Sequence, residues 1–299
     1  MVKNKKINNK IVFYVCAVAW PVLQFLIFYL CVNFNSIMLA FKKFEYSTST
    51  WSFVGFENFN QVITDFTEQV ALQQVMKNTI QLFLISLVTK LLPLIMSYYL
   101  FKKYPLHGVF KVFLFIPQII SPIALAVCFQ YFVEIAVPEF WEILFDEKIK
   151  GLLTNLDTEW GTLLFYNVWF GIGAQFLLYT GAMSGISDSV LEAAQLDGVN
   201  PIQEFIFIVF PLIYSTFVTF IVTSFAVIFT NQMNLFSFYG PGAEYSVSTI
   251  GYLLYTRTLE GTLGDYPYLA AFGLCLTFIA IPLCFGMRFL LKKLGPKTE

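Results

Sequence analysis

Residues 187–211 have the sequence SDSVLEAAQLDGVNPIQEFIFIVFP and lie between two long apolar runs of the chain. Ser189 and Glu192 have the spacing of a capping box, in which two side chains bind free backbone amides, so a helix is predicted to begin at Ser189. Gly198 can adopt the left-handed conformation that ends such a helix. Asn200 can cap a second helix, and the proline after it suits a first helical position. The stretch therefore predicts a short amphipathic helix that turns sharply into a membrane helix.

The composition of the chain shows which solvent surrounds it. Of the 299 residues, 58% are hydrophobic and only 12% are charged. A soluble domain carries about 25% charged residues, so this chain has too few charges to cover a surface that faces water. The net charge of −1 provides no long-range attraction to nucleic acid, and the five cysteines form no C-x-x-C pair. The composition predicts an integral membrane protein and excludes a secreted disulfide scaffold, a nucleic-acid binder and a disordered chain.

Six apolar runs are long enough to cross a bilayer as helices, which takes about 20 residues because every backbone polar group must be satisfied within the segment. These runs cover residues 11–32, 78–100, 109–132, 162–183, 205–230 and 268–291. The expected fold class is an all-α integral membrane protein with six transmembrane helices. They form one domain, residues 11–292, between a cytoplasmic N-terminus, 1–10, and a cytoplasmic tail, 293–299. The first run is too long for a signal peptide and is expected to remain uncleaved.

Lysine and arginine divide unequally between the two sides of the membrane. With both termini in the cytoplasm, the inner segments hold 11 of these residues and the outer loops hold 6, whereas the acidic residues divide as 5 inside and 14 outside. The positive-inside rule therefore predicts cytoplasmic termini. The inner loop 184–204 is an exception, because it carries Asp188, Glu192, Asp197 and Glu204 and no lysine or arginine. Such a loop is expected to dock onto a cytoplasmic partner.

The same loop carries the pattern EAA-x-x-DG followed by I-x-x-P, formed by Glu192, Ala193, Ala194, Asp197, Gly198, Ile208 and Pro211. After a fourth apolar run, this pattern resembles the EAA loop of permease subunits of binding-protein-dependent ABC importers. The family usually has DGA and I-x-LP, where this chain has Val199 and Phe210. The resemblance implies the fold of a type I ABC importer permease and a coupling helix, Glu192 to Gly198, seated in a cleft of a separate ATPase subunit. The alternative is an ordinary capped helix in a loop.

Other stretches resemble the carbohydrate branch of this family, which includes the maltose and glycerol-phosphate permeases. They are SFVGFENF at 52–59, Asn78-Thr79, Ile116-Pro117, NVWFG at 167–171 and Gly240-Pro241-Gly242, where the family often has the order GGP. The first of these resembles a segment that marks one of the two permease partners. The resemblance extends over nearly the whole chain and implies that the transported solute is a sugar or oligosaccharide.

Resemblance to the maltose-type permeases also implies which residues line the substrate path. The positions that match the family's substrate contacts are Gln118, Asn167, Phe170, Gly171 and Ser224. A further contact, an asparagine in those permeases, is Ile228 here, which argues against a maltose-type specificity. The structural alternatives are that the glycines permit close helix packing and that Ser224 bonds back to its own helix.

Lys90 is the only charged residue deep inside a predicted span. A buried ammonium group is costly unless it finds a partner or water, so Lys90 is expected to face the bundle interior or a polar cavity. Three roles remain open for it. It could contact an anionic sugar, pair within the bundle, or extend along a tilted helix toward the membrane surface.

The resemblance implies one subunit of an ATP-driven importer in the inner membrane of a bacterial-type cell. This chain would form half of the translocation path, a second permease subunit would complete it as a heterodimer, and an extracytoplasmic solute-binding protein would deliver the carbohydrate. The sequence has no GxxxxGK[ST] motif, so ATP and Mg²⁺ are expected on separate ATPase subunits. No cofactor, metal or catalytic residue is expected in this chain.

Three other functions remain as alternatives. An importer of a non-carbohydrate solute would share the docking loop. An integral-membrane enzyme would need clustered catalytic groups at the membrane face, and the acidic cluster without counter-charge is the docking loop itself. A secondary transporter or channel would need more ionisable groups within the spans than Lys90, together with an internal repeat that the sequence does not show.

Overall fold

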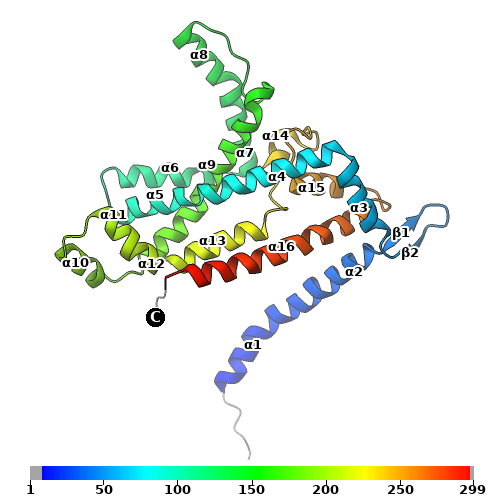
Figure 1. Cartoon of the computed structure of the whole chain (residues 1–299), viewed down its shortest axis with the longest axis horizontal. Helices are drawn as coiled ribbons and strands as arrows, with labels where there is room; N and C mark the ends of the chain where they lie inside the picture. The colour runs from blue at the N-terminus through cyan, green and yellow to red at the C-terminus, as the bar shows by residue number, and fades with distance from the viewer. Residues whose placement is uncertain (1–8, 297–299) are drawn as a thin grey trace, which may run out of the picture. The chain divides into compact units, whose positions relative to one another are not determined.

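The computed structural model describes residues 9–296, which are mostly helical (Figure 1). Contacts within the chain divide it into two compact units. Unit 1 comprises the chain up to Glu68 together with Arg257–Leu276, and unit 2 comprises Gln69–Thr256 together with the chain from Thr277 onward. The hydropathy of the sequence indicated one domain over residues 11–292 and gave no sign of this division.

Unit 1 contains a long N-terminal helix, a β-hairpin and a short amphipathic helix. Its elements are α1 (Asn9–Gln24), η1 (Phe25–Cys31), α2 (Val32–Leu39), β1 (Lys42–Glu45), β2 (Thr50–Phe53) and α3 (Glu57–Glu68). The strands pair antiparallel, with Lys42 opposite Phe53, and the all-helical expectation did not include them. The Asn58 side chain donates hydrogen bonds of 2.8 Å to the carbonyl groups of Ala40 and Lys42, which fixes α3 to the start of the hairpin.

Unit 2 contains the helices that surround the site described below. They are α4 (Val70–Thr89), α5 (Leu91–Phe101), α6 (His107–Ile119), α7 (Pro122–Tyr131), η2 (Phe132–Ala136), α8 (Val137–Phe145), α9 (Leu156–Met183), α10 (Asp188–Leu196), α11 (Pro201–Glu204), η3 (Phe205–Val209), α12 (Phe210–Leu212), α13 (Tyr214–Ala226) and α14 (Leu235–Tyr239). Two further helices, α15 (Ile250–Glu260) and α16 (Tyr266–Leu294), contribute to both units.

Five helices among residues 9–296 are long and apolar enough to cross a membrane. They are Phe13–Leu39, Val70–Phe101, Pro122–Phe145, Leu156–Met183 and Tyr266–Leu294. A sixth span arises if Pro201–Leu212 and Tyr214–Ala226, which are bent by 71°, count as one. The predicted all-α membrane fold is therefore confirmed, with five to six spans.

The apolar run 109–132, expected as one span, is interrupted in the structure. α6 ends at Ile119 and α7 begins at Pro122. A proline disfavours the helical conformation of the residue before it, and Ser121 has a non-helical ψ of 131°. The long helix that starts at Pro122 continues to Phe145, whereas α6 is a shorter apolar helix. Pro122 therefore sets the start of the membrane span, which hydrophobicity alone had placed at residue 109.

The span Val70–Phe101 is also interrupted, at Lys90 between α4 and α5. Pro93 has no backbone amide to bond the carbonyl of Thr89, and its ring crowds that carbonyl, so α4 ends at Thr89. Lys90 consequently lies at the junction of two helices, in the interior of the span.

α9 is the central helix of unit 2 and packs against α4, α5, α6 and α13 (Figure 1). Its Tyr166, Phe176 and Tyr179 are almost completely buried. Tyr166 belongs to a hydrophobic cluster with Met233, and Tyr179 belongs to a second cluster with Leu94 of α5. The two clusters position α9 relative to the elements that line the site.

Asn78 and Thr79, which match the family's NT pair, fasten α4 to the segment 245–250. The buried Asn78 amide donates to three carbonyl groups of this segment at 2.8 to 3.2 Å. The Thr79 hydroxyl accepts a hydrogen bond of 2.9 Å from the backbone amide of Ile250. The pair therefore has a structural role, because it satisfies backbone groups of an irregular segment that would otherwise be unpaired in the interior.

Candidate functional site

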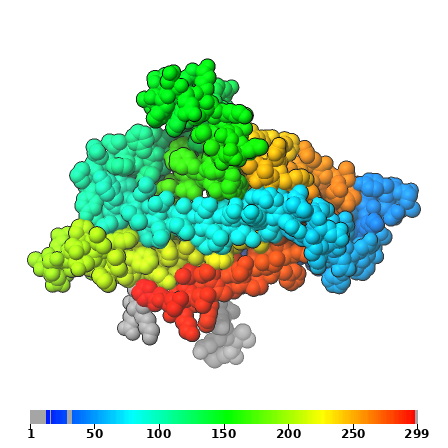
Figure 2. All heavy atoms as spheres, turned by 45° about the horizontal axis from the view of Figure 1, so that its top comes forward, coloured from blue at the N-terminus to red at the C-terminus, as the bar shows by residue number. Residues whose placement is uncertain are grey.

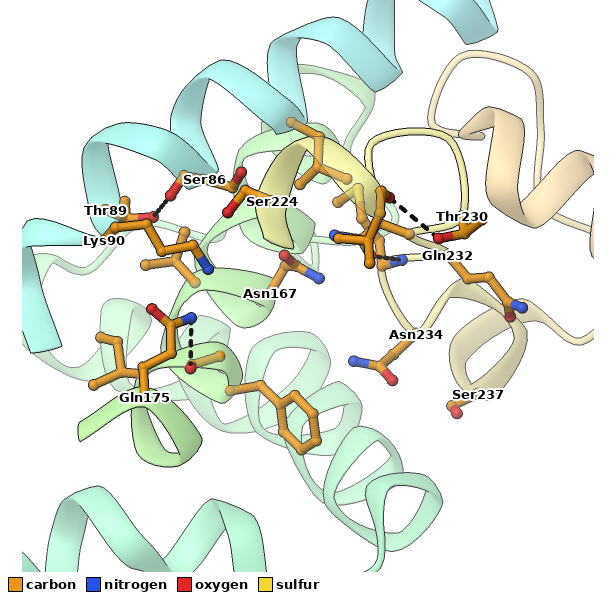
Figure 3. A pocket seen from close by; sticks show the side chains of 18 of the residues that line it. Ser86, Thr89, Lys90, Asn167, Gln175, Ser224, Thr230, Gln232, Asn234 and Ser237 are labelled. Atoms are coloured by element: carbon orange, nitrogen blue, oxygen red, sulfur yellow. Dashed lines mark hydrogen bonds between the residues drawn. The ribbon is translucent and has the colours of Figure 1, made fainter. Parts of the chain in front are cut away.

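Unit 2 contains a cavity of about 600 Å³, formed where α4 meets α5, along α9, and at the end of α13 with the segment that follows it (Figure 3). Hydroxyl and amide groups supply most of its polar lining. The polar residues are Ser86, Thr89, Lys90, Asn167, Gln175, Ser224, Thr230, Asn231, Gln232, Asn234 and Ser237. Aromatic rings lie beside them, from Phe170, Phe236 and Tyr255.

Four of the five predicted path residues line this cavity: Asn167, Phe170, Gly171 and Ser224. The fifth, Gln118 of α6, is not among the lining residues. Its amide donates a hydrogen bond of 2.6 Å to the carbonyl of Phe170, which ties α6 to α9 just behind the cavity. These contacts place the residues but do not test whether they touch a solute, which stays a prediction.

The glycines of α9 differ in what surrounds them. A side chain at Gly173 would clash with Gln118, since a Cβ at this position would come within 2.6 Å of the Gln118 Cγ, so Gly173 permits close packing of α6 and α9. Gly171 has open space where a Cβ would lie, in keeping with its position on the cavity wall. The packing alternative therefore describes Gly173, and the path role of Gly171 stays a prediction.

Ser224 and Gln175, which both line the cavity, each donate a hydrogen bond to their own helix. The Ser224 hydroxyl donates to the carbonyl of Phe220 at 2.9 Å, so it bonds back to its own helix and can only accept from a ligand. The Gln175 amide nitrogen donates to the carbonyl of Gly171 at 3.3 Å. Its oxygen is buried and accepts no hydrogen bond from any described residue. A buried acceptor without a donor is costly, and this oxygen has almost no exposed surface toward the cavity.

The segment after α13 supplies cavity residues that the sequence reasoning missed. Asn231, Gln232 and Asn234 all line the cavity, and Met233 between them is fully buried in the core. Met233 and Asn234 have positive φ angles of 53° and 56°, a conformation that is unfavourable for most residues with a side chain. The signal available in the sequence was a polar run, NQMN, placed directly after the fifth apolar run.

The predicted docking loop forms helix α10, but its N-terminal cap differs from the expectation. α10 begins at Asp188, Ser187 occupies the capping position, and no side chain makes a capping hydrogen bond there. The predicted capping box of Ser189 and Glu192 is therefore wrong. Ser189 already lies inside the helix, as its second residue, and its hydroxyl lies 3.2 Å from the hydroxyl of Ser187.

The end of α10 and the start of the next helix agree with the expectation. Gly198 has a φ of +74°, the left-handed conformation that ends a helix. Asn200 caps α11, because its side chain accepts from the backbone amide of Gln203 at 2.9 Å and the Gln203 side chain accepts from the amide of Asn200 at 3.1 Å. Pro201 is the first residue of α11, as predicted.

α10 has one packed face and one exposed face. Ala194 is buried, and Leu191 packs against the hydrophobic cluster that contains Tyr179. Glu192, Ala193, Asp197 and Gly198 are exposed. Leu196 is 89% exposed. In Figure 2 the yellow-green atoms of this region project at one end of unit 2, where a partner can reach them.

Glu204, counted in the sequence as one of four acidic residues without a counter-charge, has a partner in the structure. Its carboxylate oxygens lie 2.9 and 3.0 Å from the ammonium nitrogen of Lys102 at the end of α5. The side chains of Lys102 and Glu204 are 18% and 4% exposed. The Tyr98 hydroxyl donates to the carbonyl of Pro201 at 2.9 Å. This group joins α5 to α11, directly after the exposed loop of α10.

The C-terminal part of α16 lies at the same end of unit 2. The Tyr214 hydroxyl, at the start of α13, donates to the carbonyl of Leu291 at 2.9 Å. Lys292 and Lys293 follow in the last turn of α16, and Lys102 and Lys103 lie at the end of α5. The positive charges therefore gather at the end that carries α10, which agrees with the predicted cytoplasmic orientation.

Membrane-spanning helices around a polar cavity, with an amphipathic helix exposed at the positively charged end, define a membrane transport subunit. Residues 91–299 match the family described as "binding-protein-dependent transport system inner membrane component", and the chain belongs to this family. It is a multi-pass permease subunit of a binding-protein-dependent ABC importer in the inner membrane, and not an enzyme.

Curated relatives are similar to the chain over most of its length. The multiple sugar-binding transport system permease protein MsmF of Streptococcus mutans is 24% identical over 293 residues, covering 97% of this chain and 98% of the relative. The probable ABC transporter permease protein YurN of Bacillus subtilis is 25% identical over 213 residues, covering 68% and 70%.

A solved structure shows the same fold. It is a bacterial ABC transporter involved in the import of the acidic polysaccharide alginate, with a TM-score of 0.79 and 18% identity. The similarity covers 96% of this chain and 98% of the chain in that structure.

Proposed function

We propose that the chain forms half of the translocation path of a carbohydrate importer and that the cavity of unit 2 binds the solute on its way through. The observation that carries this proposal is the lining of the cavity, which combines hydroxyl and amide groups with the rings of Phe170, Phe236 and Tyr255. Sugars are recognised by such combinations, because their hydroxyl groups need hydrogen-bond partners and their apolar faces pack on aromatic rings. The names of MsmF and of the alginate transporter support a sugar or an oligosaccharide.

Three partners complete the proposed importer. The exposed residues Glu192, Ala193, Asp197 and Gly198 of α10 would dock into a cleft of an ATPase subunit, which holds ATP and Mg²⁺. A second permease subunit, in a heterodimer, would form the other half of the path. A solute-binding protein outside the membrane would deliver the carbohydrate, in line with the family description.

The contacts of α10 suggest how ATPase closure reaches the cavity. Leu191 packs α10 against a cluster at the inner ends of α5 and α9, Ala194 of α10 is buried, and Glu204 binds Lys102 at one end of α5. The opposite end of α5 adjoins Lys90 in the cavity wall. A displacement of α10 would therefore move α5 as a rod and change the cavity. ATP would bias the equilibrium because it binds one conformation of the ATPase pair more tightly.

Substitution of Asn167 tests whether the cavity is the path. In the assembled transporter, Asn167→Ala is expected to weaken uptake of the cognate carbohydrate by about three- to tenfold, the loss of a neutral hydrogen bond. The amount of assembled complex is expected to stay unchanged. Uptake of radiolabelled carbohydrate into proteoliposomes is the measurement.

The matched control is Gln81→Ala, because Gln81 is an exposed amide on α4 and does not line the cavity. Wild-type kinetics for Asn167→Ala would remove Asn167 from the path. Import of a non-carbohydrate solute, with no uptake of any carbohydrate, would contradict the assignment of the solute.

A further inference from the structure

We propose that Lys90 binds an anionic group, a carboxylate or a phosphate, on the transported carbohydrate. This inference rests on the proposed function and adds the charge of the solute to it. Its basis is a cation that forms no ion pair within residues 9–296 and lies in a cavity whose other polar groups are neutral.

The residues that line the cavity around Lys90 include no negative charge. Lys90 is the only charged residue among the 22 that line the cavity, and no aspartate or glutamate is among them. Lys90 takes no part in the ion pairs of Lys43 with Glu57, Lys102 with Glu204 and Lys148 with Glu142. An ammonium group in the interior of a membrane protein is stabilised by water or by an opposite charge, and a residue of this kind commonly marks a substrate pathway.

The position of Lys90 directs its charge into the cavity. Eleven residues of α5 separate it from the inner end of the span, about 16 Å at 1.5 Å per residue, too far for a lysine side chain to extend to the membrane surface. Lys90 is partly buried, and Figure 3 shows its amino group pointing into the space beside Asn167 and Gln175. The helix interruption that Pro93 causes fixes this position at the wall.

The neighbouring groups suit the hydroxyls of a sugar that carries the anion. The three N–H donors of Lys90 can bind a carboxylate or phosphate oxygen in short, charge-assisted hydrogen bonds. The Asn167 amide lines the cavity and can both donate to and accept from a ring hydroxyl. The site therefore provides one positive charge flanked by neutral amides, the arrangement that an acidic sugar or a sugar phosphate requires.

The same arrangement disfavours a neutral sugar. As the cavity closes and loses water, a neutral sugar would leave the ammonium of Lys90 without a counter-charge. An unpaired buried charge costs more than a lost neutral hydrogen bond, so the site discriminates by penalising the uncharged solute.

The test uses the whole transporter, with its partner permease, ATPases and binding protein, reconstituted in proteoliposomes. The probes are a uronate oligosaccharide, a hexose phosphate and a neutral oligosaccharide of matched length. We expect uptake of one of the anionic probes, and the preferred one identifies the group as carboxylate or phosphate. Lys90→Met is expected to lower that uptake at limiting solute by about tenfold or more, as loss of a charged hydrogen bond predicts.

Two variants serve as references for Lys90→Met. Lys90→Arg keeps the charge and is expected to retain a large part of the anion uptake. Lys77→Met removes an exposed lysine from the same helix α4, outside the cavity, and is expected to leave uptake unchanged. The amount of assembled complex, measured for every variant, separates a transport defect from a folding defect.

Each outcome decides between the two proposals. Uptake of the neutral probe alone, or equal uptake of an anionic probe by Lys90→Met and wild type, would overturn the role of Lys90 and leave the carbohydrate importer intact. Loss of assembly in Lys90→Met, restored in Lys90→Arg, would also overturn it, because Lys90 would then pair with a carboxylate of the partner permease. Uptake of none of the three carbohydrates, with uptake of another class of solute, would overturn the proposed function itself.

Discussion

Glu204 and Lys102 show how a single pair of side chains can link the exposed loop of α10 to a membrane helix. The pair is 102 residues apart in the sequence, yet its atoms lie 2.9 Å apart and are shielded from solvent. A buried ion pair often adds little stability over an apolar pair of similar size, but removing one partner leaves the other charge without compensation. The pair therefore acts mainly as a specific connection between α5 and α11.

Glu204→Gln should break this connection. The ammonium of Lys102 would lose its counter-charge in a poorly solvated position, so the free energy of unfolding is expected to fall by about 3 kcal/mol. Thermal denaturation of the purified complex measures the loss, and uptake assays measure the effect on coupling.

Two variants make this result specific. Lys103→Met removes the exposed neighbour of Lys102 and is expected to change stability little. The double variant Lys102→Met with Glu204→Met is expected to recover part of the stability without restoring full transport. Glu204→Gln with wild-type stability and uptake would show that the pair contributes to neither.

At the scale of an element, α10 combines a packed face with an exposed one over only nine residues. Leu191 and Ala194 hold it to unit 2, and Glu192, Ala193 and Asp197 remain accessible. A helix this short is marginal in isolation, so tertiary packing on one side must stabilise it. These two faces suit a helix that transmits movement, because the exposed face can contact the ATPase and the packed face contacts unit 2.

Glu192→Lys should abolish this transmission. A reversed charge on the exposed face would replace attraction in the ATPase cleft with repulsion, so uptake is expected to fall at least about tenfold. ATP hydrolysis is expected to become independent of solute, and membrane insertion is expected to stay intact. Uptake and ATPase assays on the same vesicles measure both effects.

Glu147→Lys provides the matched control, because Glu147 is an exposed carboxylate in the predicted outer loop of unit 2. Unchanged solute uptake in Glu192→Lys would contradict the coupling role of α10.

At the scale of the whole molecule, the distribution of charge predicts which face meets the ATPase. The lysines at the ends of α5 and α16 gather at the end that carries α10, and the acidic residues are mostly in the predicted outer loops. Since lysine and arginine are retained on the cytoplasmic side, α10 is expected to face the cytoplasm.

Cysteine labelling tests this orientation. In a variant without the native cysteines, Lys148→Cys is expected to react with a membrane-impermeant maleimide in intact spheroplasts, and Lys103→Cys only in inverted vesicles. Both positions are exposed lysines of unit 2, so they serve as controls for one another. The reverse pattern of labelling would contradict the orientation.

The candidate site was predictable from the sequence in part. Asn167, Phe170 and Gly171 were identified by motif and lie three and four positions apart on α9, a spacing that places residues on a shared helix face. Ser224, also identified in advance, reaches the same cavity from α13. The contribution of the segment 230–234 was missed, because its polar residues follow an irregular path that no helical period describes. Gln118, which the sequence also assigned to the path, is not among the lining residues and donates a hydrogen bond to Phe170, so its path role stays a prediction.

By itself, the sequence determined the membrane solvent, the helical fold, the predicted orientation and the short helix before the fifth span. These features depend on hydrophobicity, charge and capping residues, which act between a segment and its solvent or between residues a few positions apart. Only the tertiary structure decided that Lys90 faces a cavity without a counter-charge and that Lys102 neutralises Glu204. Both depend on which helices pack together, since partners far apart in the sequence meet only when α4, α5, α9 and α11 have assembled.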